Sequence, residues 1–181
     1  MDVVDLDRNR AIRKELESII SKTAPSLIML NGHGNDEEVT GHNGETLVKT
    51  GLNENILAKR IIYALSCRSA RILGRQSIAS GAKAYIGYTE DFIFLYSSDK
   101  RTRPLEDKTA ELFFEPSNQV MLSFIKGNDA KSSHENSKKS FTRAIQKLLT
   151  SKTPHGDTAA VKYLLWDRKH QVCLGSPTAA I

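Results

Sequence analysis

Short, continuous hydrophobic runs stand out along the first half of the chain. They cover residues 26–30, 61–65 and 82–88, and polar residues or glycines bound each of them. Continuous apolar runs of roughly 4–8 residues are typical of parallel strands that are buried on both faces of a sheet. A shorter run at residues 172–174 predicts a final strand, and residues 92–96 predict either a further strand or the floor of a pocket.

Segments in which apolar residues recur at helical spacing alternate with these runs. The spacing predicts helices over residues 8–22, 70–79, 105–125, 140–149 and 158–166. Asp157 is a candidate N-cap for the last of them. Residues 32–51 are rich in glycine and asparagine and predict a loop with a short hairpin at Asn43 and Gly44. The polar residues 126–137 predict a mobile loop, which we expect to be a site of proteolytic nicking.

The order of these elements predicts the fold class. Helix, strand, loop, strand, helix and strand follow one another, which is typical of an α/β protein with right-handed crossovers. We therefore expect a mostly parallel central sheet that is flanked by helices. The length of 181 residues and the absence of a composition break predict a single domain over residues 1–181.

Composition and charge exclude several classes of protein. The net charge of +5 is scattered along the chain, with no basic stripe or interleaved aromatic residues, so we do not expect direct binding to nucleic acid. A basic nucleic-acid-associated protein stays as the remote alternative. Two distant cysteines, a start unlike a signal peptide and no long apolar run predict a cytoplasmic protein without membrane contact. The histidines and cysteines lack metal-ligand spacing, so no metal or other cofactor is expected.

A histidine and a cysteine each follow one of the apolar runs. His33 lies between two glycines after the run at residues 26–30, and Cys67 follows the run at residues 61–65. Because ligands and chemistry gather at the carboxyl ends of parallel strands, we expect the imidazole and the thiol at one edge of the sheet. A thiolate is a nucleophile, and histidine can take the thiol proton and pass it to a leaving amine. The pattern predicts a Cys/His hydrolase.

The neighbours of these two residues add to the hypothesis. The main-chain amides of Gly34, or Gly32, and of Cys67 are candidate oxyanion-hole donors. We also expect Cys67 to lie near the N-terminus of the helix at residues 70–79, where the helix dipole would favour a thiolate. The alternative is that Cys67 is a small buried hydrophobic residue and that His33 is an ordinary loop residue.

Three segments resemble the caspase-like cysteine peptidases, nearest to the prokaryotic CHAT and gingipain-like branch. They are residues 30–35 (LNGHGN), 64–70 (ALSCRSA) and 81–88 (GAKAYIGY), and residues 173–177 (CLGSP) are similar to the end of such domains. The resemblance implies a three-layer caspase-haemoglobinase-like fold. It also implies a cysteine endopeptidase with His33 as acid and base and Cys67 as nucleophile. Arg68 departs from the pattern, since relatives often have an acidic, small or histidine residue there.

The resemblance extends to the substrate and its binding residues. Relatives that cut after arginine or lysine place a carboxylate at the base of the pocket, where it pairs with the basic side chain. Glu90 and Asp91 follow the third run and are candidates for this role, although a solvated turn is the alternative. The acidic residues 36–38 form a second candidate, as an acidic rim or a cation site. Ser66, beside the nucleophile, is a further candidate for substrate binding.

The partners that the resemblance implies are a protein or peptide substrate and an activating protein or domain. Prokaryotic relatives often act as effectors in defence or regulated cell death, and we expect a similar setting. A catalytically silent caspase-like module, which uses the cleft to bind proteins, is the alternative.

Overall fold

A four-stranded sheet forms the centre of the computed structural model, which describes residues 2–150 and 158–181. The strands lie in the order β1 (Leu27–Asn31), β4 (Ile61–Leu65), β5 (Ala84–Tyr88) and β6 (Gln171–Gly175). The first three are parallel, and β6 runs antiparallel to β5 at one edge. The predicted α/β class, with a mostly parallel sheet, is confirmed.

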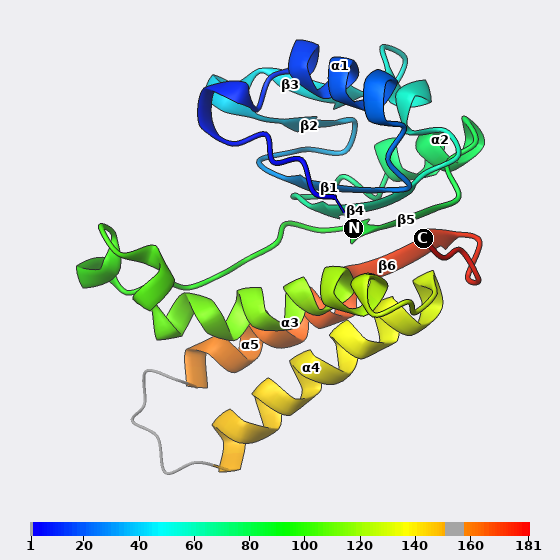
Figure 1. The fold of residues 1–181 in the computed structure, drawn as a ribbon. Coiled ribbons are helices and arrows are strands. Elements are labelled where there is room, and N and C mark those ends of the chain that lie inside the picture. The colour runs from blue at the N-terminus through cyan, green and yellow to red at the C-terminus, as the bar shows by residue number, and fades with distance from the viewer. Residues whose placement is uncertain (1, 151–157) are drawn as a thin grey trace.

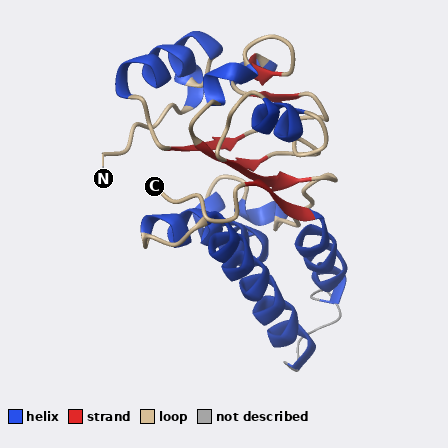
Figure 2. Ribbon diagram, turned by 90° about the vertical axis from the view of Figure 1, so that its right-hand side faces the viewer, coloured by secondary structure: helices blue, strands red, loops and turns tan. Residues whose placement is uncertain are grey.

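Helices cover both faces of this sheet (Figure 1). One layer contains α1 (Arg13–Thr23), α2 (Leu73–Ala79) and a hairpin of β2 (Glu38–Thr40) and β3 (Thr46–Lys49). The other layer contains α3 (Lys108–Ile125), α4 (Ala130–Thr150) and α5 (Thr158–His170). Figure 2 shows the strands between these two layers, which is a three-layer arrangement.

Burial on both faces explains why β4 and β5 read as continuous apolar runs. All five residues of β4 are buried. Ile62 and Ala64 pack with the layer of α1 and the hairpin, whereas Ile61, Tyr63 and Leu65 pack toward α3. Since successive strand residues point to opposite faces, a strand between two helical layers needs an apolar residue at every position.

The hairpin is also confirmed. β2 and β3 pair antiparallel, and the turn between them contains Asn43 at φ 52° and Gly44 at φ 76°. Both values fall in the left-handed region, which asparagine and glycine adopt more readily than other residues. The local sequence therefore determines this turn.

The mobile loop expected at residues 126–137 is wrong. Helix α4 begins at Ala130, and the carboxylate of Asp129 accepts the main-chain N–H of Ser132 at 2.8 Å. Ser133 and Ser137 are fully buried, and Ser137 Oγ donates to the carbonyl of Pro116 in α3 at 2.8 Å. Small side chains let two helices approach closely, so a serine face here marks a helix contact. The basis for a nicking site in this segment is lost.

We expect Ser137→Ala to lower the free energy of unfolding by about 1 kcal/mol, the usual contribution of one hydrogen bond. The substitution removes the bond to Pro116 but leaves the close packing of α3 and α4 intact. Lys139→Ala, on the exposed side of the same helix, is the control and should change stability by a few tenths at most. Urea denaturation of both variants measures the difference, and equal midpoints would contradict this role for Ser137.

The last predicted helix is longer than the sequence pattern indicates. The helix predicted over residues 158–166 continues to His170, and the proposed N-cap Asp157 lies outside the described residues.

Residues 92–96 form no strand; Phe94 and Tyr96 instead line a groove of about 650 Å³ against α3, as the pocket alternative predicts. Within the described ranges, no helix is long and apolar enough to cross a membrane.

Candidate active site

The register of two parallel strands brings His33 and Cys67 to one edge of the sheet. Asn31, the last residue of β1, lies opposite Leu65, the last residue of β4. His33 and Cys67 each lie two positions beyond this pair, and the N–H of Gly32 still donates to the carbonyl of Leu65 at 3.4 Å. The two turns therefore begin side by side, as the sequence predicts.

Gly34 lies in close contact with the turn that carries Cys67. A Cβ atom at Gly34 would lie 2.1 Å from Ser66 Oγ and 3.2 Å from the carbonyl oxygen of Cys67. Only glycine allows this approach without a shift of the neighbours. The side chain of Ser66 is 2 % exposed and packs against Gly34. It therefore faces the loop of His33, in a position that a substrate does not reach without movement.

The thiol of Cys67 is half-buried beside the segment that follows β5. Sγ lies 4.0 Å from the carbonyl oxygen of Phe92. Burial raises the pKa of the thiol, and the negative charge of Asp91 adds to the shift. The contact with the carbonyl of Phe92 and the positive charge of Arg68 oppose it. Because an ordinary thiol pKa of 9.0 already lies above neutral pH, this cysteine is a protonated thiol at pH 7.

The expected effect of a helix dipole on Cys67 is wrong. Helix α2 begins at Leu73, and turn residues separate it from the cysteine. The dipole acts only within the first turn of a helix, so α2 does not stabilise a thiolate at Cys67. The apolar spacing that predicted an earlier start includes two residues of the turn, the buried Ala70 and the exposed Ile72.

The imidazole of His33 is exposed to solvent. Within residues 2–150 and 158–181, its ring makes no hydrogen bond, either to Cys67 or to any other group. Its main-chain carbonyl accepts the N–H of Thr40 at 2.9 Å, which fixes the loop to strand β2. The backbone of the two residues is thus brought together, whereas the hydrogen bond of an assembled dyad is not formed.

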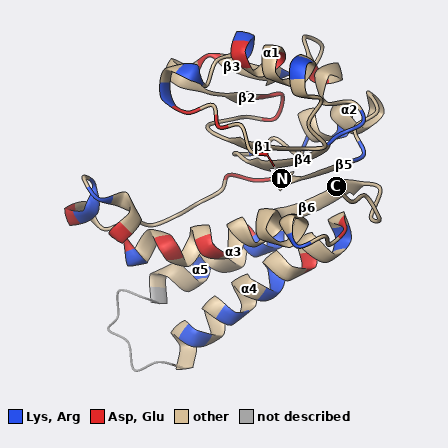
Figure 3. Ribbon diagram, viewed as in Figure 1, with Lys and Arg blue, Asp and Glu red and all other residues tan. Residues whose placement is uncertain are grey.

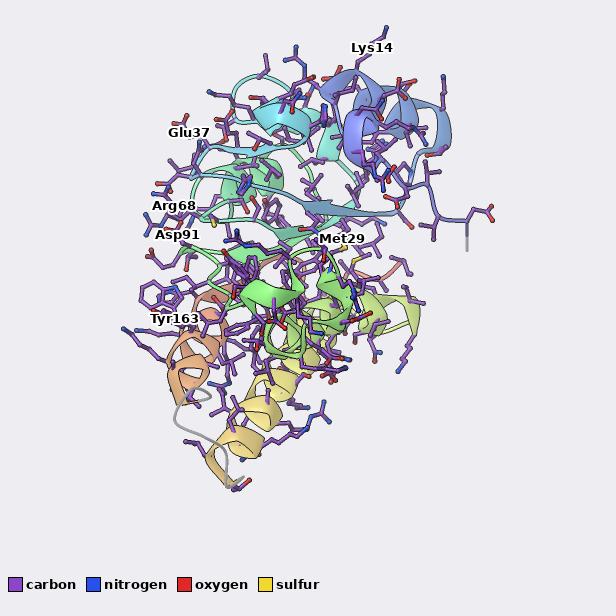
Figure 4. All side chains as sticks on the ribbon, turned by 90° about the vertical axis from the view of Figure 1, so that its left-hand side faces the viewer. Lys14, Met29, Glu37, Arg68, Asp91 and Tyr163 are labelled. Carbon is purple, nitrogen blue, oxygen red and sulfur yellow. The ribbon has the colours of Figure 1, made fainter. Side chains whose placement is uncertain are left out.

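The two predicted substrate-binding carboxylates follow β5 and are paired with arginines of this chain. Asp91 Oδ1 lies 3.0 Å from Nε of Arg68, and Glu90 pairs with Arg71. Asp36 contacts both arginines, each at 3.6 Å. Figure 4 shows Arg68 and Asp91 together on one side of the molecule. A basic substrate side chain at this place would have to displace Arg68 or Arg71.

Helix α5 contributes two contacts that sequence reasoning missed. The indole N–H of Trp166 donates to the carbonyl of Asp91 at 3.0 Å, and the N–H of Ile93 donates to Asp167 Oδ1 at 3.0 Å. Asp167 is fully buried, and burial raises the pKa of its carboxyl to about 8. The sequence signal was weak, because Asp167 is followed by basic residues and resembles the exposed end of a helix.

A metal centre would need several ligating side chains close together. Among the residues that the structure describes, no group of three or more histidine, cysteine, aspartate and glutamate side chains has the arrangement to hold a metal ion. In Figure 3, lysine and arginine occur in both helical layers, and carboxylates lie among them. The candidate site therefore rests on His33, Cys67 and the charged residues around them.

Comparison with known proteins adds no family assignment. No protein-family model matches the chain, no curated protein matches it, and no solved structure matches it.

Proposed function

We propose that the protein is a cysteine endopeptidase in which His33 and Cys67 form the catalytic pair. The observation that carries the proposal is the register of β1 and β4, since Asn31 lies opposite Leu65 and each reactive residue follows two positions later. The resemblance to caspase-like peptidases rests on the same residues. The close contact of Gly34 with Ser66 and Cys67 supports the proposal further.

The chemistry follows from these two side chains. His33 takes the proton of Cys67, and the thiolate attacks the carbonyl carbon of the scissile amide to form a tetrahedral intermediate. The imidazolium then gives its proton to the leaving amine as the C–N bond breaks, which leaves an acyl-enzyme. His33 next takes a proton from water, the hydroxide attacks the thioester, and the carboxylic acid leaves as the thiol re-forms.

Two main-chain amides support the negative oxygen of the tetrahedral intermediate in this proposal. Within the described ranges, the N–H groups of Gly34 and Cys67 donate to no main-chain carbonyl. Both belong to the turns that meet at the edge of the sheet. Donors of this kind are effective because they need no reorganisation as charge develops.

The resting thiol must be activated before it reacts. Burial keeps the pKa of Cys67 raised, and the ring of His33 is not bonded to it. We therefore propose that a substrate or an activating protein moves the exposed imidazole onto Sγ. Such a partner would act on the loop of residues 32–36, which ends at the ion pairs of Asp36 with Arg68 and Arg71.

Labelling with peptide acyloxymethyl ketones tests the proposal. Probes with arginine, aspartate or leucine next to the warhead are expected to modify the wild-type protein at Cys67. Cys67→Ala should abolish labelling, and His33→Ala should slow it by about 100-fold, the usual contribution of a general base. Cys173→Ala is the matched control, because that thiol is half-buried on β6, and it should label at the wild-type rate. Equal labelling of wild type and His33→Ala would contradict the dyad.

A catalytically silent binding module is the second candidate. The raised pKa of Cys67 and the pairing of Asp91 with Arg68 favour it. Under this function none of the three probes labels the protein, with or without cell extract as a source of activator. Labelling in either condition removes this candidate.

A further inference from the structure

Two consecutive residues of α5 hold the segment that borders Cys67. We call residues 89–97, which leave β5 and cross toward α3, the 89–97 strip. The indole N–H of Trp166 donates to the carbonyl of Asp91, and the carboxyl group of Asp167 accepts the N–H of Ile93. Phe92 lies between these two anchors, and its carbonyl oxygen is the one that contacts Cys67 Sγ. Both anchors thus act on the neighbours of the residue that covers the thiol.

A buried carboxyl group such as that of Asp167 is an unusual residue for a contact that is purely structural. The side chain is fully buried, and its second oxygen, Oδ2, has no hydrogen-bond partner among the described residues. Burial raises the pKa of two hydroxyls, those of Tyr63 in β4 and Tyr88 in β5, and the charge of Asp167 adds to both shifts. A buried acidic group without full pairing lowers stability compared with an apolar residue. Because Asp167 lowers the stability of the fold, we look for a contribution to the site that offsets this cost.

We infer that Asp167 is a positioning residue for the thiol of Cys67. By fixing the N–H of Ile93, it holds the main chain of Phe92 against Sγ and keeps the thiol half-buried. The inference rests on the proposed function in that it takes Cys67 as the nucleophile. Trp166 adds to the effect, because it holds Asp91, whose carboxylate pairs with Arg68 directly after the nucleophile.

The rate of alkylation by iodoacetamide tests this role without any requirement for peptidase activity. Peptide mass spectrometry of the full chain measures Cys67 and Cys173 separately. Asp167→Ala should release the strip, expose the thiol and speed alkylation of Cys67 about fivefold or more at pH 8, since reactivity follows exposure and burial is the largest cause of the raised thiol pKa. Asp167→Asn keeps the Oδ1 acceptor and should stay within about twofold of wild type.

The control acts on the same strip at its far end. Asp107 accepts the N–H of Ser97 at 2.8 Å and caps α3, so Asp107→Ala also removes a buried carboxylate that holds the strip. It should leave the rate at Cys67 within about twofold of wild type. Cys173 serves as an internal standard, because a general loosening of the fold would raise its rate as well.

The outcomes separate the inference from the proposed function. An unchanged rate at Cys67 in Asp167→Ala, or an equal rise at Cys173, overturns the inference. If Asp167→Ala does not fold, Trp166→Phe replaces it; this side chain is 37 % exposed, and loss of its N–H should raise the rate at Cys67 alone. If iodoacetamide alkylates the proteins at the expected rates but no peptide ketone labels the wild type, the positioning role of Asp167 stands and the proposed peptidase activity is contradicted.

Discussion

Asp167→Asn is expected to remove a steady fall in the stability of the folded protein between about pH 4 and pH 8. Burial raises the pKa of this carboxyl from 3.8 to about 8, so the folded protein keeps the proton while the unfolded chain loses it. The stabilising contribution is therefore complete below the unfolded pKa and is lost as the pH rises through the folded one. At 1.36 kcal/mol for each unit, the loss is on the order of 5 kcal/mol.

Urea denaturation of wild type and Asp167→Asn at pH 3, 4, 6 and 8 measures this difference. The two proteins should diverge as the pH rises, with the variant more stable at pH 8. Asp129→Asn is the control with the opposite sign: bonds from the main chain and hydroxyl of Ser132 lower the pKa of Asp129, so its effect is present above about pH 4 and fades below it. Parallel curves for wild type and Asp167→Asn would contradict the raised pKa.

Gly34→Ala is expected to separate the two turns that carry His33 and Cys67, the proposed catalytic pair. The added Cβ would lie 2.1 Å from Ser66 Oγ and 2.8 Å from the main-chain oxygen of Glu38, so one of the turns must move. Overpacking of this kind lowers the free energy of unfolding by about 1–3 kcal/mol. Labelling of Cys67 by the peptide ketones should slow on the order of 100-fold, as in His33→Ala, because His33 no longer reaches the thiol.

A second substitution distinguishes a local clash from a general loss of structure. Ser66→Ala removes the nearest atom, and since Ser66 Oγ has no hydrogen-bond partner in the part of the chain that is described, it should be close to neutral for stability. The double variant with Gly34→Ala and Ser66→Ala should recover only part of the lost stability, because the clash with the main-chain oxygen of Glu38 remains. Wild-type stability and labelling in Gly34→Ala would show that the turns do not need their close contact.

Most of the sheet was predictable because the burial of its strands determines which residues they contain. β4 and β5 are buried at every position between the two helical layers, so apolar residues occupy successive positions. β1 is an edge strand with Met29 and Asn31 exposed, and its apolar run was recognised although only one of its faces is buried. The direction of β6 was not predictable, since a short apolar run has the same appearance in a parallel and an antiparallel strand. The start of α4 was missed for a related reason. Buried serines such as Ser133 and Ser137 have the composition of a loop but the spacing of a packed helix face.

Some features of the candidate site were likewise predictable from the sequence, and others were not. His33 and Cys67 were predicted because each ends an apolar run, and the carboxyl ends of adjacent parallel strands meet at one edge. Glu90 and Asp91 were correctly expected after β5, but their pairing with Arg71 and Arg68 was not. Ion pairs of this kind depend on where each turn directs its side chains, which no spacing rule specifies.

The sequence by itself determined where the strands lie along the chain, the hairpin at Asn43 and Gly44, and the edge of the sheet at which the histidine and the cysteine lie. These features depend on local patterns of burial and turn geometry. Only the tertiary structure decided the state of the thiol. Its burial, the contact with Phe92 and the hydrogen bonds of Trp166 and Asp167 join segments that are 25 to 75 residues apart, and contacts over that distance leave no periodic signal in the chain.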